Sequence, residues 1–226
     1  MDREESLKRA VGKADLCELL SCAFSYPDQQ LAQAMSDGAL ASDAQACLAD
    51  AGTADAVATQ AVAALLALRG ASPDEVLSAM RRAYTRLYLA PGGHALVFPY
   101  ESAFLHVASG APGVPALFRT KTTLDVERCM REAGVVAKNA RKEPCDSASG
   151  EFEFLSYLYA QQAEALRLGD DEATALRDSQ ARAFLQGHAL AWLPSFMART
   201  AELAEGPYAA LAAYAVTALS ILADEG

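Results

Sequence analysis

Side chains that could carry out catalysis are few in this sequence, and they stand far apart. The three histidines, His94, His106 and His188, form no HExxH or HxxxH spacing, so a zinc site is not predicted. Glu151 and Glu153 differ by two positions and would lie on different sides of a helix. No GxxxxGK[ST], GxGxxG or GxSxG motif occurs. The sequence therefore does not predict an enzyme.

Aromatic side chains, carboxylates and helix-breaking residues gather instead in three short segments. The first spans residues 84–104 and contains a loop rich in glycine and proline. The second spans residues 143–155 and begins with Glu-Pro-Cys-Asp. The third spans residues 184–196 and contains the single tryptophan, Trp192. Because loops and helix ends commonly carry binding residues, these three segments are the candidate functional region.

Each segment contains a recognisable pattern. The first has Tyr-x-x-Leu-Tyr at 84–88 and Pro-x-Glu-Ser-x-Phe at 99–104. The second has Glu-Pro-x-Asp at 143–146, followed by Glu151, and the third has Phe-x-x-x-His-x-x-x-Trp at 184–192. In this order, the patterns resemble those of the TorD/DmsD-type redox-enzyme maturation chaperones, to which nitrate-reductase chaperones are related.

The resemblance implies an all-helical, cytoplasmic chaperone with no catalytic role and no resident cofactor. Members of the family bind the twin-arginine leader and the immature body of molybdenum-containing oxidoreductases, and they delay export until the cofactor is loaded. The implied partners are a leader peptide and the apo form of a molybdopterin oxidoreductase. Two alternatives stay open: an assembly chaperone for a leaderless, membrane-bound reductase subunit, and a helical protein that binds a small molecule or, weakly, a nucleotide.

A twin-arginine leader has a cationic part and an apolar part, so its receptor needs an apolar groove bordered by carboxylates. Arginine would be favoured over lysine, because its planar fork can engage a carboxylate through two hydrogen bonds. The residues expected to form the peptide-binding site are Tyr84, Tyr88, Pro99, Tyr100, Glu101, Ser102, Glu143, Pro144, Asp146, Ser147, Glu151, His188 and Trp192.

Most of these residues also have a structural interpretation. The tyrosines of the first segment and the tryptophan stand at helical spacing from other apolar residues and could be core packing. Glu101 and Ser102 could cap the helix that starts near them, and Asp146 could be either a helix cap or a ligand contact. His188 could be a buried histidine with satisfied hydrogen bonds.

One position departs from the family pattern. Where the family usually places histidine after the aspartate, this chain has Ser147, followed by Ala148 in place of the common isoleucine. The change removes from the loop a hydrogen-bond donor that can carry positive charge. The resemblance therefore implies a divergent subgroup.

Helices must position these segments, because apolar residues recur at three- and four-residue steps through most of the chain. Ser72-Pro73-Asp74-Glu75 is the clearest helix start, since serine can cap and proline suits the first helical position. The predicted helices span about residues 7–24, 28–50 in two pieces broken near Gly38, 54–68, 72–88, 101–108, 116–133, 149–168, 171–197 with a bend, and 207–222.

The predicted fold is all-α: a compact, single-domain bundle of roughly ten helices over residues 1–226. A solenoid is not expected, because no segment repeats at a fixed period. The polar segment at about 135–147 is expected to be a hinge or functional loop before the C-terminal helices. The expected state is a monomer, or a domain-swapped dimer if that hinge exchanges helices between protomers.

Net charge excludes one class of partner. The 19 Lys and Arg against 29 Asp and Glu give a formal net charge of −10, which would repel a nucleic acid backbone. The same charge suits a cationic partner, although it also serves solubility. No stretch is long and apolar enough for a membrane span or a secretory signal. Five cysteines without CxxC spacing indicate reduced thiols in the cytoplasm.

Overall fold

A computed structural model describes residues 2–89, 95–136 and 143–224. Over these residues it contains helices and no strand, so the all-α prediction is confirmed. The helices are α1 (Arg3–Phe24), α2 (Gln29–Asp37), α3 (Ala39–Asp50), α4 (Asp55–Leu66), α5 (Pro73–Tyr84), α6 (Glu101–Ala108), α7 (Lys121–Glu132), α8 (Ala148–Leu168), α9 (Asp171–Phe184), α10 (Leu190–Leu203) and α11 (Pro207–Ala223). Two π-helical turns, η1 (Thr85–Leu89) and η2 (Leu185–Ala189), extend α5 and join α9 to α10. Counted with these joins, the described chain forms ten continuous helices.

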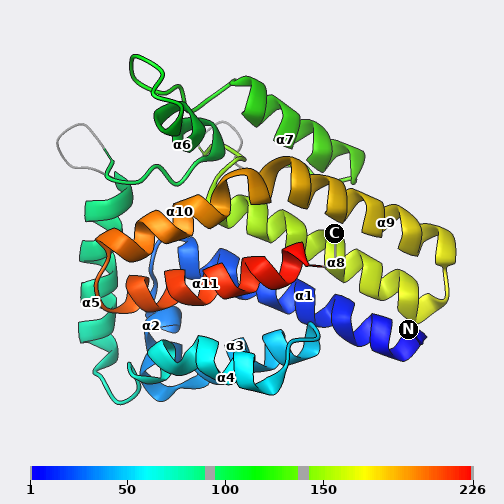
Figure 1. Ribbon diagram of the computed structural model, residues 1–226, viewed down its shortest axis with the longest axis horizontal. Coiled ribbons are helices and arrows are strands. Elements are labelled where there is room, and N and C mark those ends of the chain that lie inside the picture. Colours follow the sequence, from blue (N-terminus) through cyan, green and yellow to red (C-terminus); the bar gives the residue numbers. More distant parts are fainter. Residues whose placement is uncertain (1, 90–94, 137–142, 225–226) are drawn as a thin grey trace.

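The helices surround one cluster of buried apolar side chains. The long helices α1 and α8 pack along each other through the middle of the molecule, and α11 packs against α10 (Figure 1). Helices α2, α3 and α4 lie on one side of this central group, and α6 and α7 lie on the other (Figure 1). The three motif segments therefore meet at the α6 side of the bundle, far from α4.

Several helices begin directly after a residue whose side chain caps them. The side chains of Asp2, Asp28, Thr120 and Asp170 each accept a hydrogen bond from the backbone N–H three residues later. Ser72 precedes α5 as predicted, but its hydroxyl makes no capping hydrogen bond. Of the predicted start signal, the structure therefore confirms only the proline at the first helical position.

The predicted helix at 116–133 begins too early. Helix α7 starts at Lys121, because Thr120 caps it and Arg119 has a positive φ of 58°, outside the helical range. The end of α7 at Glu132 is close to the predicted end, because Gly134 has a positive φ of 85° that stops the helix.

The helix predicted over 171–197 does bend, and it also runs further, to Leu203. Its direction changes between α9 and α10 at the π turn η2, which contains Gly187 (Figure 1). Pro194 lies inside α10 and would meet the carbonyl of Leu190, the first residue after the π turn. A wider turn just before that carbonyl accommodates the proline.

A close helix crossing depends on Gly12. A β-carbon at this position of α1 would lie 2.4 Å from the backbone nitrogen of Ala51, just after α3. No larger residue fits without moving backbone, so the glycine holds α1 against the end of α3.

Candidate functional site

Two loops from distant parts of the sequence are joined by their backbones. Tyr100, before α6, and Ser147, before α8, form an isolated antiparallel bridge. The N–H of Glu101 donates to the carbonyl of Asp146 at 2.8 Å, and the N–H of Ala148 donates to the carbonyl of Pro99 at 3.0 Å. The first two motif segments are therefore in direct contact.

The side chain of Asp146 caps a helix, but not the helix that follows it. Its Oδ2 accepts a hydrogen bond from the backbone N–H of Ser102 at 3.0 Å, in the first turn of α6. Helix α8 is capped instead by Ser147, whose hydroxyl accepts from the N–H of Gly150 at 3.1 Å. Serine is a strong capping residue, so the departure from the family's histidine has a structural use here.

The contacts of Asp146 and Ser147 with residues 99–102 fix the end of the expected hinge in place. Residues 137–142 lie outside the described residues. Pro144, Cys145 and Asp146 are buried, and the Cys145 thiol donates to the carbonyl of Thr123 at 3.3 Å. Only Glu143 at the start of this stretch is exposed.

The third motif segment completes a buried polar network. Nδ1 of His188 lies 2.9 Å from Oε2 of Glu101, and the indole N–H of Trp192 donates to Oε2 of Glu151 at 2.9 Å. The other ring nitrogen of His188 lies 3.4 Å from the carboxylate of Asp125, on α7. This side of the imidazole borders a cavity of about 300 Å³ between α7 and η2. We call Glu101, Asp146, Glu151, His188 and Trp192 the buried network.

The three carboxylates of the buried network are closed off from solvent. Glu101 is 3% exposed, and Asp146 and Glu151 are 0% exposed. One oxygen each of Asp146 and Glu151 has no hydrogen-bond partner among the described residues. As the structure stands, none of the three can reach a guanidinium group on the protein surface.

Burial sets the charge states of this network. Burial, and then the charge of Glu101, raises the pKa of Glu151 well above its usual range. Burial also raises the pKa of Asp146, although its hydrogen bonds with Ser102 oppose this. Burial alone would lower the pKa of His188, but the hydrogen bond to Glu101 and the charges of Glu101 and Asp125 raise it.

We expect Glu151→Gln to make stability less dependent on pH. A raised pKa in the folded protein contributes stability below the unfolded value, and this contribution is lost as pH rises through the folded value. Glutamine mimics the protonated acid, keeps an acceptor for Trp192 and cannot ionise. In urea titrations from about pH 5 to about pH 9, the variant should lose less stability than the parent.

The matched control is Glu153→Gln, on the exposed side of the same helix. His188 acts in the same direction as Glu151, because its pKa is also raised, so some pH dependence should remain in Glu151→Gln. Parallel pH curves for the parent and Glu151→Gln would contradict the assignment.

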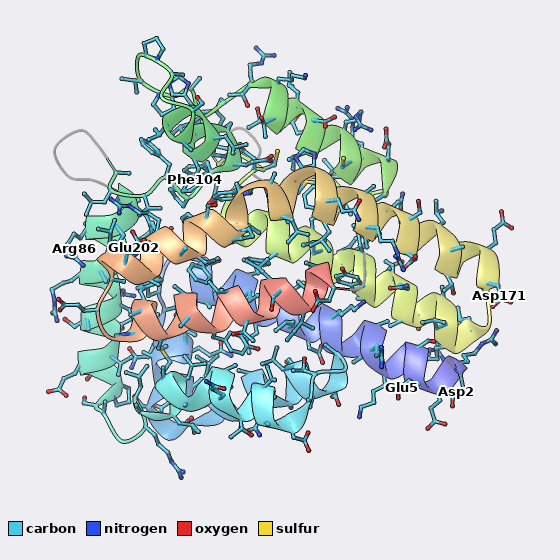
Figure 2. All side chains as sticks on the ribbon, viewed as in Figure 1. Asp2, Glu5, Arg86, Phe104, Asp171 and Glu202 are labelled. Carbon is cyan, nitrogen blue, oxygen red and sulfur yellow. The ribbon has the colours of Figure 1, made fainter. Side chains whose placement is uncertain are left out.

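The aromatic site residues divide between core and surface. Trp192 is 0% exposed, with its ring centroid 5.1 Å from Phe196 and 5.7 Å from Phe104, which lies beside α10 (Figure 2). Tyr88 is buried, stacks on Phe196 at 5.6 Å and shares a hydrogen bond with Thr200 at 3.1 Å. Core packing is therefore what Trp192 and Tyr88 do in this structure.

A partly exposed set of tyrosines lies next to this core. Tyr84 is half-buried, and its ring lies 5.3 Å from Tyr26, which is 54% exposed. Burial raises the pKa of Tyr84 to about 12, with contributions from Tyr100 and Glu143. Burial and the charges of Glu143 and Asp146 also raise the pKa of Tyr100. We call Tyr26, Tyr84, Tyr100 and Glu143 the tyrosine surface.

The structure thus brings the predicted residues together, some of them partly exposed at the surface and others buried. Pro99, Tyr100 and Ser102 are partly exposed, Pro144 and Ser147 are buried, and the buried network lies beneath them. Sequence reasoning missed Tyr26, Asp125 and Thr200. A Tyr-Pro pair directly after a helix was a usable signal for Tyr26, whereas no pattern marked the other two.

Two kinds of feature are absent from the described residues. Within the described ranges, no three His, Cys, Asp or Glu side chains are placed to hold a metal ion. Among these residues, no helix combines the length and hydropathy that a membrane span requires.

Comparison with known protein families gave a match. A family described as nitrate reductase delta subunit matches residues 49–198, which include all three motif segments. No curated protein matches the chain. The matched range contains every residue of the buried network. It leaves out α1, α2 and almost all of α3 at one end, and the last residues of α10 and all of α11 at the other.

Proposed function

Because the chain belongs to the nitrate reductase delta subunit family, a family of molybdoenzyme maturation chaperones, we propose that it is a cytoplasmic chaperone for one such enzyme. It binds the twin-arginine leader and the immature body of a molybdenum-containing oxidoreductase, assists cofactor loading and delays export. The membership confirms the resemblance to redox-enzyme maturation chaperones. The role requires no catalytic step of its own.

The observation that carries the leader proposal is the tyrosine surface. Aromatic faces attract guanidinium groups, and Glu143 places an exposed carboxylate beside Tyr84 and Tyr100. The partly exposed tyrosine rings also offer apolar area to the hydrophobic part of a leader.

The buried network supports this surface from below. It holds the loop carrying Tyr100 against the turn that follows Glu143, through the backbone bridge and the Asp146 cap. In this proposal, Glu101, Asp146 and Glu151 act as positioning residues, and the leader contacts Tyr84, Tyr100 and Glu143. Preformed loops lower the ordering cost of binding.

We expect a synthetic twin-arginine leader peptide to bind more tightly than its twin-lysine version, by roughly tenfold at low salt. Glu143→Gln should remove most of this preference, and Tyr100→Ala should weaken both peptides. Fluorescence anisotropy over a range of salt concentrations measures the effect, because screening should reduce the preference.

Glu172→Gln is the matched control, since it removes an exposed carboxylate from the start of α9, away from the tyrosine surface. Equal affinity for the two peptides at every salt concentration would refute the arginine–carboxylate contact. Unchanged binding in Tyr100→Ala would place the peptide elsewhere.

The family description favours a second candidate, an assembly chaperone for a membrane-bound reductase subunit without a leader. Purification of the native complex from cells separates the two. A client with a twin-arginine leader supports the first function, and a reductase subunit without one supports the second.

A further inference from the structure

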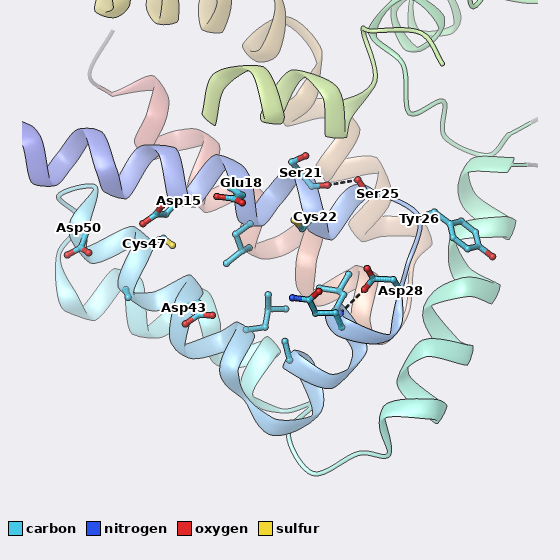
Figure 3. Close-up of a pocket in the computed structure, with 16 residues that line it drawn as sticks. Asp15, Glu18, Ser21, Cys22, Ser25, Tyr26, Asp28, Asp43, Cys47 and Asp50 are labelled. Atoms are coloured by element: carbon cyan, nitrogen blue, oxygen red, sulfur yellow. Dashed lines mark hydrogen bonds between the residues drawn. The ribbon is translucent and has the colours of Figure 1, made fainter. Parts of the chain in front are cut away.

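A groove of about 590 Å³ lies between α1, α2 and α3, and Tyr26 is the residue that it shares with the tyrosine surface (Figure 3). Its apolar lining comes from all three helices, with Leu19 on α1, Leu31 and Ala34 on α2, and Leu40 on α3. The volume falls within the range of ligand-binding clefts, and the mixed lining offers places for several apolar side chains.

Carboxylates surround this apolar lining. Asp15 and Glu18 on α1 stand across the groove from Asp43 on α3, with Asp28 and Asp50 towards its ends (Figure 3). Lys8 pairs with Asp50 at 3.3 Å, but no lysine or arginine is among the residues that line the groove in the described chain. The groove is therefore acidic as well as apolar.

These charges act on one another. Burial and the charges of Glu18 and Asp50 raise the pKa of Asp15. The negative charges also act on the thiol of Cys47. Burial and nearby aspartates raise the pKa of this thiol to about 12. Asp15, Glu18 and Asp50 therefore repel one another, and a cationic ligand in the groove would reduce that repulsion.

The negative charge of the groove also limits which kind of ligand can bind there. Anionic lipid headgroups and nucleic acid carry the same sign as the groove. A second copy of this chain would bring a net charge of −10 towards it. A peptide segment of another protein that alternates basic and apolar side chains satisfies both the carboxylates and the apolar lining.

We propose that the groove between α1, α2 and α3 is a second peptide-binding site, which takes a basic, partly apolar segment of a partner protein. Its lining residues, from Asp15 to Asp50, lie almost entirely outside the family match at 49–198. The site is therefore a property of the N-terminal helices and is separate from the buried network. Its test uses no twin-arginine sequence and no variant of the tyrosine surface, so this proposal can fail without refuting leader recognition.

Cys22 provides a reporter inside the groove. It lines the groove and is exposed, whereas Cys17, Cys47 and Cys145 are buried. Cys129 is partly exposed, so the test uses a Cys129→Ser background. The probe is a short peptide of alternating leucine and lysine that carries a pyridyl disulfide. A peptide of alternating leucine and glutamate with the same disulfide is the comparison. The Cys22 thiolate attacks the disulfide, forms a mixed disulfide with the peptide and releases thiopyridone, whose absorbance gives the rate.

The cationic peptide should modify Cys22 at least about tenfold faster than the anionic peptide at low salt. Asp28→Asn with Asp43→Asn should reduce this ratio, and asparagine can still cap α2 in place of Asp28. Glu4→Gln with Glu172→Gln removes the same charge from the far end of α1 and from α9, and it should leave the ratio unchanged. Circular dichroism verifies that every variant is folded.

A third variant tests the apolar part of the site. Ala46 is exposed and lines the groove, so Ala46→Trp should fill it and slow the peptide but not a small cationic thiol reagent. Ser42→Trp, on the same helix but not in the lining, is the control. Equal rates for the two peptides, equal effects of the two charge-removing pairs, or no effect of Ala46→Trp would each overturn the proposal.

Discussion

Replacing Glu101 with alanine is expected to lower the free energy of unfolding by about 3–5 kcal/mol, because it removes one partner of a buried pair. His188 would keep its buried position and lose its 2.9 Å hydrogen bond. Its only other carboxylate partner among the described residues, Asp125, is 3.4 Å away with a half-exposed side chain. Urea denaturation followed by circular dichroism measures the loss.

Glu101→Gln is the control for this prediction. Glutamine preserves the side-chain length and can still hydrogen-bond the imidazole, so its loss should be much smaller. A double-mutant cycle with His188→Ala should show that the two single losses are not additive. A loss below about 1 kcal/mol in Glu101→Ala would mean that the pair behaves as an exposed ion pair.

Trp192→Ala is expected to cost a similar amount, about 3–5 kcal/mol, through the cavity left in the core. The indole is fully buried between Phe104 and Phe196, and its N–H donates to Oε2 of Glu151. Circular dichroism is again the measurement, because this variant removes the single tryptophan.

Trp192→Phe separates packing from hydrogen bonding. Phenylalanine retains most of the ring contacts but leaves Glu151 without its donor, so the loss should be smaller than in Trp192→Ala yet clearly measurable. Adding Glu151→Gln to Trp192→Phe tests the coupling between the two side chains. Wild-type stability in Trp192→Ala would show that the core closes over the missing ring.

These two expectations bear on function through the loops that the network holds. In the proposed site the leader contacts Tyr100 and Glu143 at the surface, while Glu101 and Trp192 lie beneath. Variants of the buried network should therefore reduce leader binding together with stability. Glu143→Gln should affect binding alone, because its side chain is exposed.

The helices were largely predictable because their signals are local. Apolar spacing, capping residues and the positions of glycine and proline act within one or two turns. There are two clear differences. The first has an equally local cause, since Arg119 and Thr120 delay the start of α7, and in the second the bent helix after Asp171 ends at Leu203 rather than near residue 197.

The three ordered motifs also predicted that their segments would form one region, and the structure joins these segments. Local sequence patterns predict the all-α class, most helix boundaries and most of the residues that meet. How deeply these residues lie depends on the packing of the whole fold: Glu101, Asp146 and Glu151 are buried, and Glu143 is exposed. Burial depends on contacts between segments that are distant in sequence, such as Glu101 with His188, and no local pattern encodes it. The same holds for the acidic groove, whose carboxylates become neighbours only when α1, α2 and α3 pack together.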